Sequence, residues 1–255
     1  MSRKLGQHFL INPETASRIN RLISPETGEH ILEVGPGKGF LTSFLTEGDA
    51  RLTAVEIDSK YAGFMRERFS GKINVIEDDF LKVDLDELSP DKICGNLPYQ
   101  ISGKIIEKVL LSGVRWKRAV FMLPYAVAER VAAWPHRKSY SALSVLCAYA
   151  IERREINFRV PPEDFQPPPE IDSAVVSLDK KMHAPSENFC RIVKGVFRTR
   201  RKKVKNSIIK NFSLTPGLSS EILSETGIDE RMRPHQLTPE SFKMLEEAFV
   251  KFSVF

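Results

Sequence analysis

Cysteine is scarce in this sequence, with three residues among 255: Cys94, Cys147 and Cys190. They lie far apart and have no closely spaced Cys or His partners, so the sequence predicts neither a disulfide framework nor a bound metal. No stretch approaches the roughly 18 uninterrupted apolar residues of a membrane span, and residues 1–8 lack an apolar signal-peptide core. We therefore expect a soluble, cytoplasmic protein that has no contact with a membrane.

An excess of charge of one sign is also missing. The 38 Lys and Arg residues nearly balance the 33 Asp and Glu residues, which gives a net charge of +5 and only mildly favours polyanionic partners. However, six cations fall within eight residues, and such a cluster repels itself unless it is solvated or faces phosphates. A solvated helix face and an RNA-binding site are both open interpretations. The six residues are Arg198, Arg200, Arg201, Lys202, Lys203 and Lys205.

Short apolar runs alternate with amphipathic stretches from about residue 30 to 125, which is typical of repeated βαβ units and a parallel sheet. The sequence thus predicts an α/β fold. We expect strands at 30–34, 52–57, 73–77, 92–95, 119–123, 153–158 and 174–178. We expect helices at 13–23, with Asn12 as its N-cap, and at 59–69, 103–111, 126–133 and 142–150.

The pattern changes after Leu178. Residues 180–186 have the composition of a linker, and the remaining chain has helical spacing at 189–209, 219–226 and 239–252. We therefore predict two domains, an α/β domain at 1–180 and a small helical domain at 181–255.

A glycine-rich turn follows the first long strand directly and precedes a helix that opens at Phe40. Gly35 and Gly37 have no Cβ, so the backbone can turn tightly and approach a ligand closely. Glu56, 21 residues after Gly35, ends the next strand, where a carboxylate can accept both hydroxyl hydrogens of an adenosine ribose. This pattern indicates a nucleotide-type ligand, although a tight turn with no ligand remains possible.

The spacing of the turn separates three ligand classes. A phosphate-binding loop needs Ser or Thr after its lysine, but Lys38 is followed by Gly39. A dinucleotide site usually has two residues between its second and third glycines, whereas only Lys38 separates Gly37 from Gly39. The spacing therefore favours S-adenosylmethionine.

Two further acids belong to this region. Glu33 lies within an apolar strand and needs a polar partner, which we expect to be the turn's backbone or the ligand's amino end. Asp79 follows the third strand, where it could accept a hydrogen bond from the adenine of the cofactor. A solvated turn acid is the alternative interpretation for Asp79.

The chemistry is predicted at Asn96, which ends the fourth long strand and begins the run Asn-Leu-Pro-Tyr. In a doubly wound sheet this strand lies beside the first, so both motifs face one crevice. The Asn96 amide oxygen and the Leu97 carbonyl could accept both hydrogens of an aromatic amine and direct its lone pair at the methyl donor. Tyr99 could stack on a base that has left its helix. Orientation then supplies most of the rate, and no histidine is close in sequence.

Taken together, these motifs resemble the ribosomal RNA adenine dimethyltransferases, in particular their small-subunit members. The resemblance covers nearly the whole chain. Its motifs are Gln7-His8-Phe9-Leu10, Glu33-Val34-Gly35-Pro36-Gly37, Glu56-Ile57-Asp58, Asn96-Leu97-Pro98-Tyr99-Gln100-Ile101-Ser102, Phe165-Gln166-Pro167-Pro168-Pro169, Asp172-Ser173-Ala174-Val175-Val176 and Arg200-Arg201-Lys202.

The resemblance implies a seven-stranded, Rossmann-like methyltransferase sheet and a helical RNA-binding C-terminal domain. It implies dimethylation of two adjacent adenines near the 3′ end of small-subunit rRNA, on the RNA or a pre-30S particle, by a monomer. It also places Phe165 opposite Tyr99, around the target adenine, whereas the residues alone indicate a core aromatic. The implied cofactor contacts are His8, Leu10, Gly35, Gly37, Glu56, Ile57, Asp79, Phe80 and Asn96.

One departure from the family and several rival functions remain. Pro124-Tyr125-Ala126 stands where many members have Gln-Lys-Glu, a triplet that we expect to contact substrate RNA or the rim of the site, so the change concerns RNA docking more than methyl transfer. A large-subunit methylase of the antibiotic-resistance type is the nearest rival, although Gly227-Ile228-Asp229 with Arg231 and Arg233 resembles the small-subunit branch. A nicotinamide-dependent reductase is a second rival, but it would need a catalytic acid such as a Tyr-Lys pair, which residues 96–99 do not provide. A non-catalytic ribosome-assembly factor is the third alternative.

Overall fold

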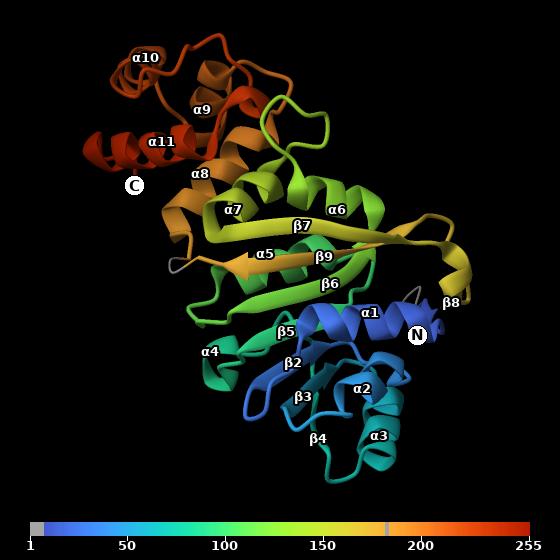
Figure 1. Ribbon diagram of the computed structural model, residues 1–255. Coiled ribbons are helices and arrows are strands. Elements are labelled where there is room, and N and C mark those ends of the chain that lie inside the picture. The colour runs from blue at the N-terminus through green and yellow to red at the C-terminus, as the bar shows by residue number, and fades with distance from the viewer. Residues whose placement is uncertain (1–7, 182–183) are drawn as a thin grey trace. The chain divides into compact units, whose positions relative to one another are not determined.

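The computed structural model describes residues 8–181 and 184–255, so Gln7 of the N-terminal motif and residues 182–183 of the predicted linker lie outside the described part. Two compact units are present (Figure 1). The sheet unit comprises described residues up to 129 together with 151–181, and the helical unit comprises 130–150 together with 184–255. Residues 130–150, which the sequence placed in the first domain, thus group with the C-terminal helices.

The sheet unit contains a seven-stranded sheet with the order β4-β3-β2-β5-β6-β9-β7, which confirms the predicted fold class (Figure 1). The first five strands in this order run parallel, whereas β9 pairs antiparallel with both β6 and β7. The strands are β2 (His30–Val34), β3 (Arg51–Glu56), β4 (Ile73–Glu77), β5 (Lys92–Asn96), β6 (Arg118–Pro124), β7 (Ile151–Val160) and β9 (Ser173–Lys180).

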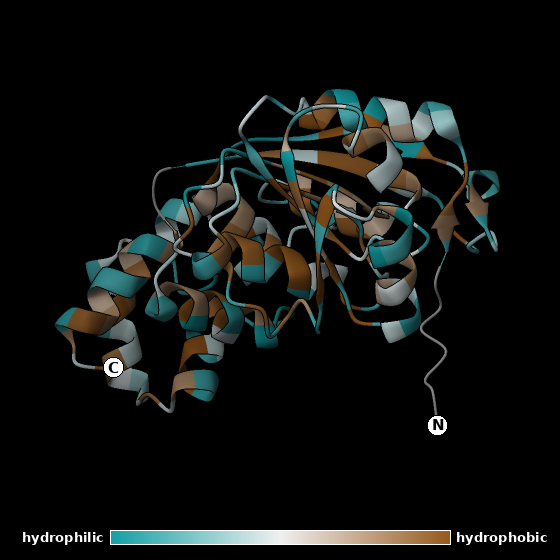
Figure 2. Cartoon of the chain, turned by 90° about the horizontal axis from the view of Figure 1, so that it is seen from below, coloured by the Kyte–Doolittle hydropathy of each residue, from teal (hydrophilic) through white to brown (hydrophobic). Residues whose placement is uncertain are grey.

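Hydrophobic residues concentrate on the central strands, as the hydropathy colouring in Figure 2 shows. All five residues of β2 are buried, because helices cover a parallel sheet on both faces. Helix α1 (Pro13–Ile23) packs Ile19 and Ile23 into the core that also holds Ile31 of β2. Its start was predicted correctly, since the Asn12 side chain accepts from the backbone N–H groups of Glu14 and Thr15.

The other helices of the sheet unit are α2 (Phe40–Leu45), α3 (Ser59–Arg68), α4 (Leu85–Leu88) and α5 (Ser102–Leu111). Helix α6 (Tyr125–Ala132) spans the boundary between the units. The helical unit contains α7 (Ala142–Ala150), α8 (Glu187–Arg198), α9 (Val204–Phe212), α10 (Pro216–Glu225) and α11 (Pro239–Lys251). The rings of Tyr149 in α7 and Phe189 in α8 lie 4.2 Å apart, which explains why α7 belongs with these helices.

The prediction of one helical stretch over 189–209 was wrong. Helix α8 ends at Arg198 and α9 begins at Val204, with a turn between them. Within this turn the Lys202 N–H donates to the Thr199 carbonyl at 2.8 Å, and the Val204 N–H donates to the Met232 carbonyl at 2.7 Å. These hydrogen bonds to non-helical partners interrupt the helix, and helical spacing of apolar residues does not record them.

Two short strands were not predicted. Strand β1 (Phe9–Leu10) pairs antiparallel with β8 (Phe165–Gln166), which follows a 3₁₀ turn at Pro162–Asp164. A second 3₁₀ turn, Pro234–Gln236, lies in the helical unit. The pairing of β1 with β8 joins segments that are more than 150 residues apart in the sequence.

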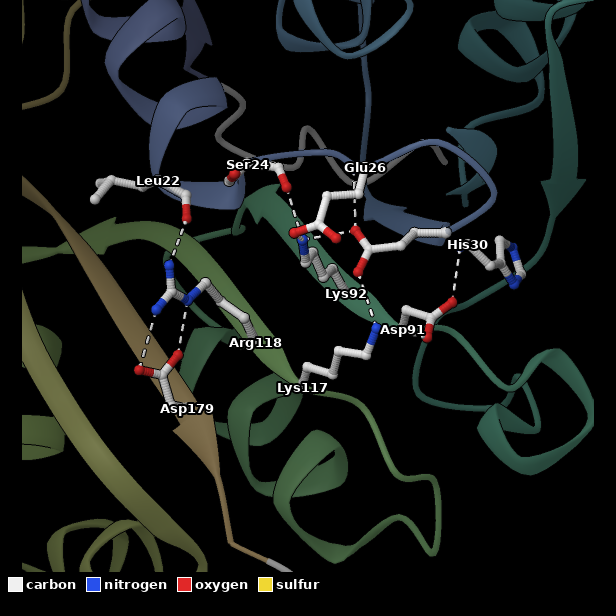
Figure 3. Close-up of polar contacts among 10 residues, drawn as sticks. Leu22, Ser24, Glu26, His30, Asp91, Lys92, Lys117, Arg118 and Asp179 are labelled. Atoms are coloured by element: carbon white, nitrogen blue, oxygen red, sulfur yellow. Dashed lines mark hydrogen bonds and ion pairs between the residues drawn. The ribbon is translucent and has the colours of Figure 1, made fainter. Parts of the chain in front are cut away.

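The opposite, amino-terminal edge of the sheet holds a cluster of ion pairs (Figure 3). Lys92 and Glu29 are both buried, and Lys92 Nζ lies 2.6 Å from Glu29 Oε2. Lys117 Nζ contacts the other oxygen of Glu29 at 3.0 Å, and the Ser24 carbonyl accepts from Lys92 at 2.6 Å. Burial opposes ionisation, but the hydrogen bonds from Lys92 and Lys117 hold the pKa of Glu29 below its usual value.

We expect Lys92→Met to lower the free energy of unfolding by about 3 kcal/mol, because it leaves the Glu29 carboxylate buried without its nearest cation. Denaturant unfolding of the full chain measures this loss. The matched control is Arg153→Met, which removes an ion pair of similar length whose side chains are 70% and 47% exposed. The control should cost less than about 1 kcal/mol. Equal losses in the two variants would contradict the buried pair's importance.

Candidate active site

A cavity of about 350 Å³ lies at the carboxyl ends of the parallel strands, entirely within the sheet unit. Parallel strands that are neighbours in the sheet deliver their following loops to one edge, so distant motifs meet there. Nine residues that were predicted to contact the cofactor all line it. They are His8, Leu10, Gly35, Gly37, Glu56, Ile57, Asp79, Phe80 and Asn96, and Leu97 and Tyr99 line it as well.

The glycine turn is fixed by Glu56. One carboxylate oxygen accepts the Gly37 N–H at 3.0 Å, and the other accepts the Asp58 N–H at 2.9 Å. Gly37 has a φ of +54°, and a Cβ there would lie 2.8 Å from the Phe9 ring, so this position requires glycine. Burial raises the pKa of Glu56, and the two backbone hydrogen bonds oppose that rise.

Glu33 is the second buried carboxylate of the cavity, with 2% of its surface exposed. The Thr42 hydroxyl donates to Glu33 Oε2 at 2.7 Å. Burial raises the pKa of Glu33 to about 7, and the nearby Glu56 contributes in the same direction. Thr42 is therefore the polar partner that the position of Glu33 in an apolar strand led us to expect. Within the described part of the chain, no ion pair joins Glu33 or Glu56 to a cation.

The loop after β4 brings a carboxylate and an aromatic ring to the same cavity. Asp79 is partly buried, and its Oδ1 accepts the Leu81 N–H at 2.9 Å, which fixes the side chain. Phe80 is buried, whereas Ile57 at the end of β3 is 54% exposed and forms an open apolar wall. Asp78 also lines the cavity but is exposed.

Asn96 lies at the last position of β5. Its Nδ2 donates to the His8 carbonyl at 2.9 Å, so the amide nitrogen is directed at strand β1 and its oxygen is left for another donor. The Leu97 N–H donates to the Met122 carbonyl at 2.8 Å, which fixes the start of the turn. A Cβ at the preceding Gly95 would overlap the Val34 carbonyl, so only glycine allows β5 to approach β2 this closely.

Tyr99 and His8 lie together in the lining of the cavity. Their ring centroids are 5.3 Å apart at an interplanar angle of 37°. Tyr99 Oη and Ser173 Oγ share a hydrogen bond of 2.5 Å, which fixes the tyrosine against β9, and burial raises the pKa of the phenol. His8 Nδ1 bonds to the Pro167 carbonyl at 2.8 Å. Although no histidine is near Asn96 in sequence, the fold places His8 there.

Strand β1 is held in place by a buried acid that sequence reasoning missed. Asp164 accepts from Asn12 Nδ2 at 2.7 Å and from the Thr15 hydroxyl at 2.6 Å. These contacts join the start of α1 to the segment that leads into β8. No local sequence signal could have shown this, because the partners lie about 150 residues apart.

Phe165 differs in position from the other predicted catalytic residues. It is 2% exposed, belongs to the main hydrophobic core and does not line the cavity. Its register partner across the two-stranded sheet is Leu10, which does line the cavity. Phe9 is a further cavity residue without an assigned role, and its ring lies 4.6 Å from Lys38 Nζ.

The predicted RNA-binding cations lie in the helical unit. Residues 200–203 occupy the turn between α8 and α9 and therefore do not lie on a helix face. Arg198 and residues 200–203 are exposed, whereas Lys205 is partly buried and its Nζ contacts Glu230 at 2.6 Å. The cluster therefore offers several exposed cations and one that already has an acidic partner.

The cavity fits an adenosine-bearing cofactor. Glu56 and Asp79 place fixed hydrogen-bond acceptors at the ends of successive strands, and Ile57 and Phe80 add apolar walls. Gly37 has no side chain to occupy the cavity. Nothing comparable exists for a metal, because the structure contains no cluster of three or more His, Cys, Asp or Glu side chains that could bind one within residues 8–181 and 184–255. Similarly, no helix in these ranges is long and apolar enough to cross a membrane.

Comparisons with known proteins agree with this geometry. The family model described as "Ribosomal RNA adenine dimethylase" matches residues 1–251. The chain is 37% identical to a protein of Geobacter sulfurreducens described as "Ribosomal RNA small subunit methyltransferase A", covering 97% of this chain and 95% of that protein. It is 33% identical to the protein of the same description from Treponema pallidum, covering 97% and 90%.

Two solved structures share the fold. A dimethyladenosine transferase from Plasmodium falciparum superposes with a TM-score of 0.82 at 22% identity, covering 96% of this chain and 98% of that one. The 23S rRNA methyltransferase ErmE has a TM-score of 0.66 at 24% identity, covering 94% and 98%. At these identities the two structures establish the common fold.

The buried Glu33 makes stability depend on pH. Its pKa is about 7 in the folded chain against a usual value of 4.5, so its contribution is fully present below pH 4.5 and is lost as the pH rises through 7. The free energy of unfolding should therefore fall by up to about 3 kcal/mol as the pH rises from 4.5 to above 7, and we expect Glu33→Gln to abolish this fall. Denaturant unfolding across this range measures it, and Glu87→Gln, an exposed acid of α4, is the control. An unchanged pH dependence in Glu33→Gln would contradict the burial effect.

Proposed function

Because the chain belongs to the ribosomal RNA adenine dimethylase family, we propose that it dimethylates two adjacent adenines near the 3′ end of small-subunit rRNA. It is an rRNA adenine dimethyltransferase, and its methyl donor is S-adenosylmethionine. The observation that supports the proposal is Asn96, which lines the same cavity as Glu56 and Asp79 and whose amide nitrogen is bound to the His8 carbonyl.

The choice of the small subunit rests on the relatives. Those with 33% and 37% identity over nearly the whole chain are described as small-subunit methyltransferases. The large-subunit enzyme ErmE shares the fold at lower identity. We propose that the substrate is the RNA or a pre-30S particle, that the enzyme acts as a monomer, and that it works in the cytoplasm where small subunits are assembled.

The cavity residues have distinct roles in binding the cofactor, which supplies a methyl group on a positively charged sulfur. Glu56 would accept hydrogen bonds from the ribose hydroxyls, and its backbone partners hold it ready to do so. Asp79 would accept from the adenine amino group, between Ile57 and Phe80. Glu33 would lie toward the amino end, where a positive charge would favour its ionised form.

Asn96 would act on the target amine by orienting it. Its Oδ1 and the Leu97 carbonyl accept one hydrogen each, which favours a pyramidal nitrogen with its lone pair directed into the cavity. The bond from Asn96 Nδ2 to the His8 carbonyl prevents the amide from turning its nitrogen toward the substrate. After transfer the nitrogen carries the positive charge and releases its proton, so orientation rather than a strong base supplies most of the rate.

Tyr99 would stack on the target base from one side. The hydrogen bond to Ser173 holds the ring in position. The family resemblance also places Phe165 at this base, but from its core position the ring would first have to turn toward the cavity. In this structure we assign Phe165 a supporting role, through its pairing with Leu10.

Parallel methylation assays with labelled S-adenosylmethionine test the substrate. One assay contains undermodified 30S particles and the other contains 23S RNA. We expect incorporation into the 30S particles alone. Incorporation into 23S RNA alone would overturn the small-subunit assignment, and incorporation into neither would support a non-catalytic assembly factor.

We predict that Asn96→Ala lowers methyl transfer by about a hundredfold or more, since it removes the acceptor that orients the amine. Binding of rRNA should stay within about twofold of wild type, because the substitution removes no cation. Asn74→Ala, at an exposed position of β4, is the matched control and should keep full activity. Retained transfer in Asn96→Ala would refute the role given to this residue.

We propose that the exposed cations of the α8–α9 turn bind RNA phosphates. Replacing Arg201, Lys202 and Lys203 together with Ala should weaken rRNA binding and reduce the slope of log affinity against log salt by about 2 to 3. Arg200 is left in place, because its guanidinium donates to the Lys138 carbonyl and supports another loop. Lys243→Ala on α11 is the control. An unchanged slope in the triple variant would indicate that these side chains are merely solvated.

A further inference from the structure

The loop between α6 and α7, residues 133–141, presents an aromatic ring that the proposed methylation chemistry does not use. Trp134 is 64% exposed, which makes it the most exposed of the large apolar side chains that the structure describes. The loop belongs entirely to the helical unit. Its next residues, His136, Arg137 and Lys138, are exposed too. An exposed indole beside cations is a feature that needs a physical account.

The backbone of this loop is fixed at several points. Tyr140 is fully buried, and its hydroxyl donates to the Leu237 carbonyl at 3.0 Å. The His136 N–H donates to the His235 carbonyl at 2.9 Å, and the Arg137 N–H donates to the Trp134 carbonyl at 3.3 Å. His136 has a φ of +70°, which is strained for a residue with a side chain and persists because these bonds hold it. The backbone that carries Trp134 is therefore held in one conformation.

The same bonds join the loop to the basic turn that follows α8. The Arg200 guanidinium donates to the Lys138 carbonyl. Two contacts place the segments 133–141, 198–205 and 231–236 side by side, since the His136 N–H bonds to the His235 carbonyl and Arg200 bonds to the Lys138 carbonyl. Burial lowers the pKa of His235, and the charges of Arg200, His136 and Arg233 lower it further. Cations that repel one another in this way favour an anionic ligand.

Acidic side chains offset this charge only in part. Residues 130–141 and 198–205 contain no Asp or Glu. Two acids, Asp229 and Glu230, precede the third basic segment, residues 231–236. Each already has a cationic partner, since Asp229 pairs with Arg231 at 2.8 Å and Glu230 pairs with Lys205 at 2.6 Å. The surface thus combines a net positive field with one large exposed ring.

We propose that Trp134 stacks on an unpaired base of the rRNA substrate while the neighbouring cations bind the flanking phosphates, an inference that rests on the rRNA-methylating function proposed above. Stacking on an aromatic ring and ion pairing to phosphates are the two interactions by which proteins hold single-stranded RNA. A protein partner would more often meet an apolar patch, whereas Trp134 is surrounded in its loop by His136, Arg137 and Lys138. This contact is separate from the target adenine, which is bound in the sheet unit.

Tryptophan fluorescence tests the contact directly, because Trp116 and Trp134 are the only tryptophans of the chain. Trp116 is 2% exposed and its indole N–H donates to the Val109 carbonyl at 3.1 Å. We expect a transcript of the 3′ part of small-subunit rRNA to quench wild-type emission, and the Trp134→Phe variant to show little quenching. Equal quenching in both, or none in wild type when filter binding shows a complex, would overturn the stacking role.

Affinity measurements separate stacking from charge. Trp134→Ala should weaken binding of the transcript about tenfold with an unchanged salt slope, and Trp134→Phe should recover most of the loss. Arg137→Gln should instead reduce the slope by about 1. Met244→Ala, a 41% exposed apolar residue of α11 in the same unit, is the control and should bind like wild type. Wild-type affinity in Trp134→Ala would refute the inference.

The two proposals fail in different ways. If wild type methylates 30S particles but Trp134→Ala has an unchanged KM and affinity, the stacking contact is wrong and the proposed function stands. If RNA quenches Trp134 but wild type transfers no methyl group to any rRNA, the RNA contact stands and the proposed function is wrong. With both correct, Trp134→Ala should raise the KM for 30S particles several-fold and leave kcat nearly unchanged.

Discussion

The hydrogen bond from Asn96 Nδ2 to the His8 carbonyl is the contact on which the active site depends. An amide has a donor end and an acceptor end, and in the proposed reaction this bond would decide which of them faces the substrate. The acceptor is His8, at the start of the segment that β8 and Asp164 hold in place. The orientation of the Asn96 amide therefore depends on the pairing of β1 with β8 as much as on the Asn-Leu-Pro-Tyr run.

The cavity is electrostatically prepared for a donor-rich, positively charged ligand. Glu33 and Glu56 are both buried and receive hydrogen bonds from Thr42 and from backbone N–H groups, with no ion pair to a cation among the described residues. Burial raises the pKa of both carboxyls, which means that holding them ionised in the cavity lowers the stability of the fold. A ligand that brings hydroxyl groups and positive charge would relieve this cost, which is how S-adenosylmethionine differs from a phosphate-bearing nucleotide.

Much of the sheet unit could be predicted because its signals are local. The apolar run 30–34 and the Asn12 cap correctly predicted β2 and the start of α1, and strand-end positions correctly brought Glu56, Asp79 and Asn96 to one cavity. The β1–β8 pair and the Asp164 contacts could not be predicted, since their partners lie about 150 residues apart. The break between α8 and α9 was missed because its hydrogen bonds run to Met232 and Thr199 rather than along a helix.

The most direct test of the account is mass spectrometry of small-subunit rRNA from undermodified 30S particles that have been incubated with the protein and S-adenosylmethionine. The account predicts two additional methyl groups on each of two adjacent adenines near the 3′ end. Methyl groups on a different base, on a ring nitrogen or on ribose would contradict it. Methylation of a ring nitrogen or of ribose would show that Asn96 and the Leu97 carbonyl do not orient an exocyclic amine, and methylation of a different base would show that the two adenines are not the substrate.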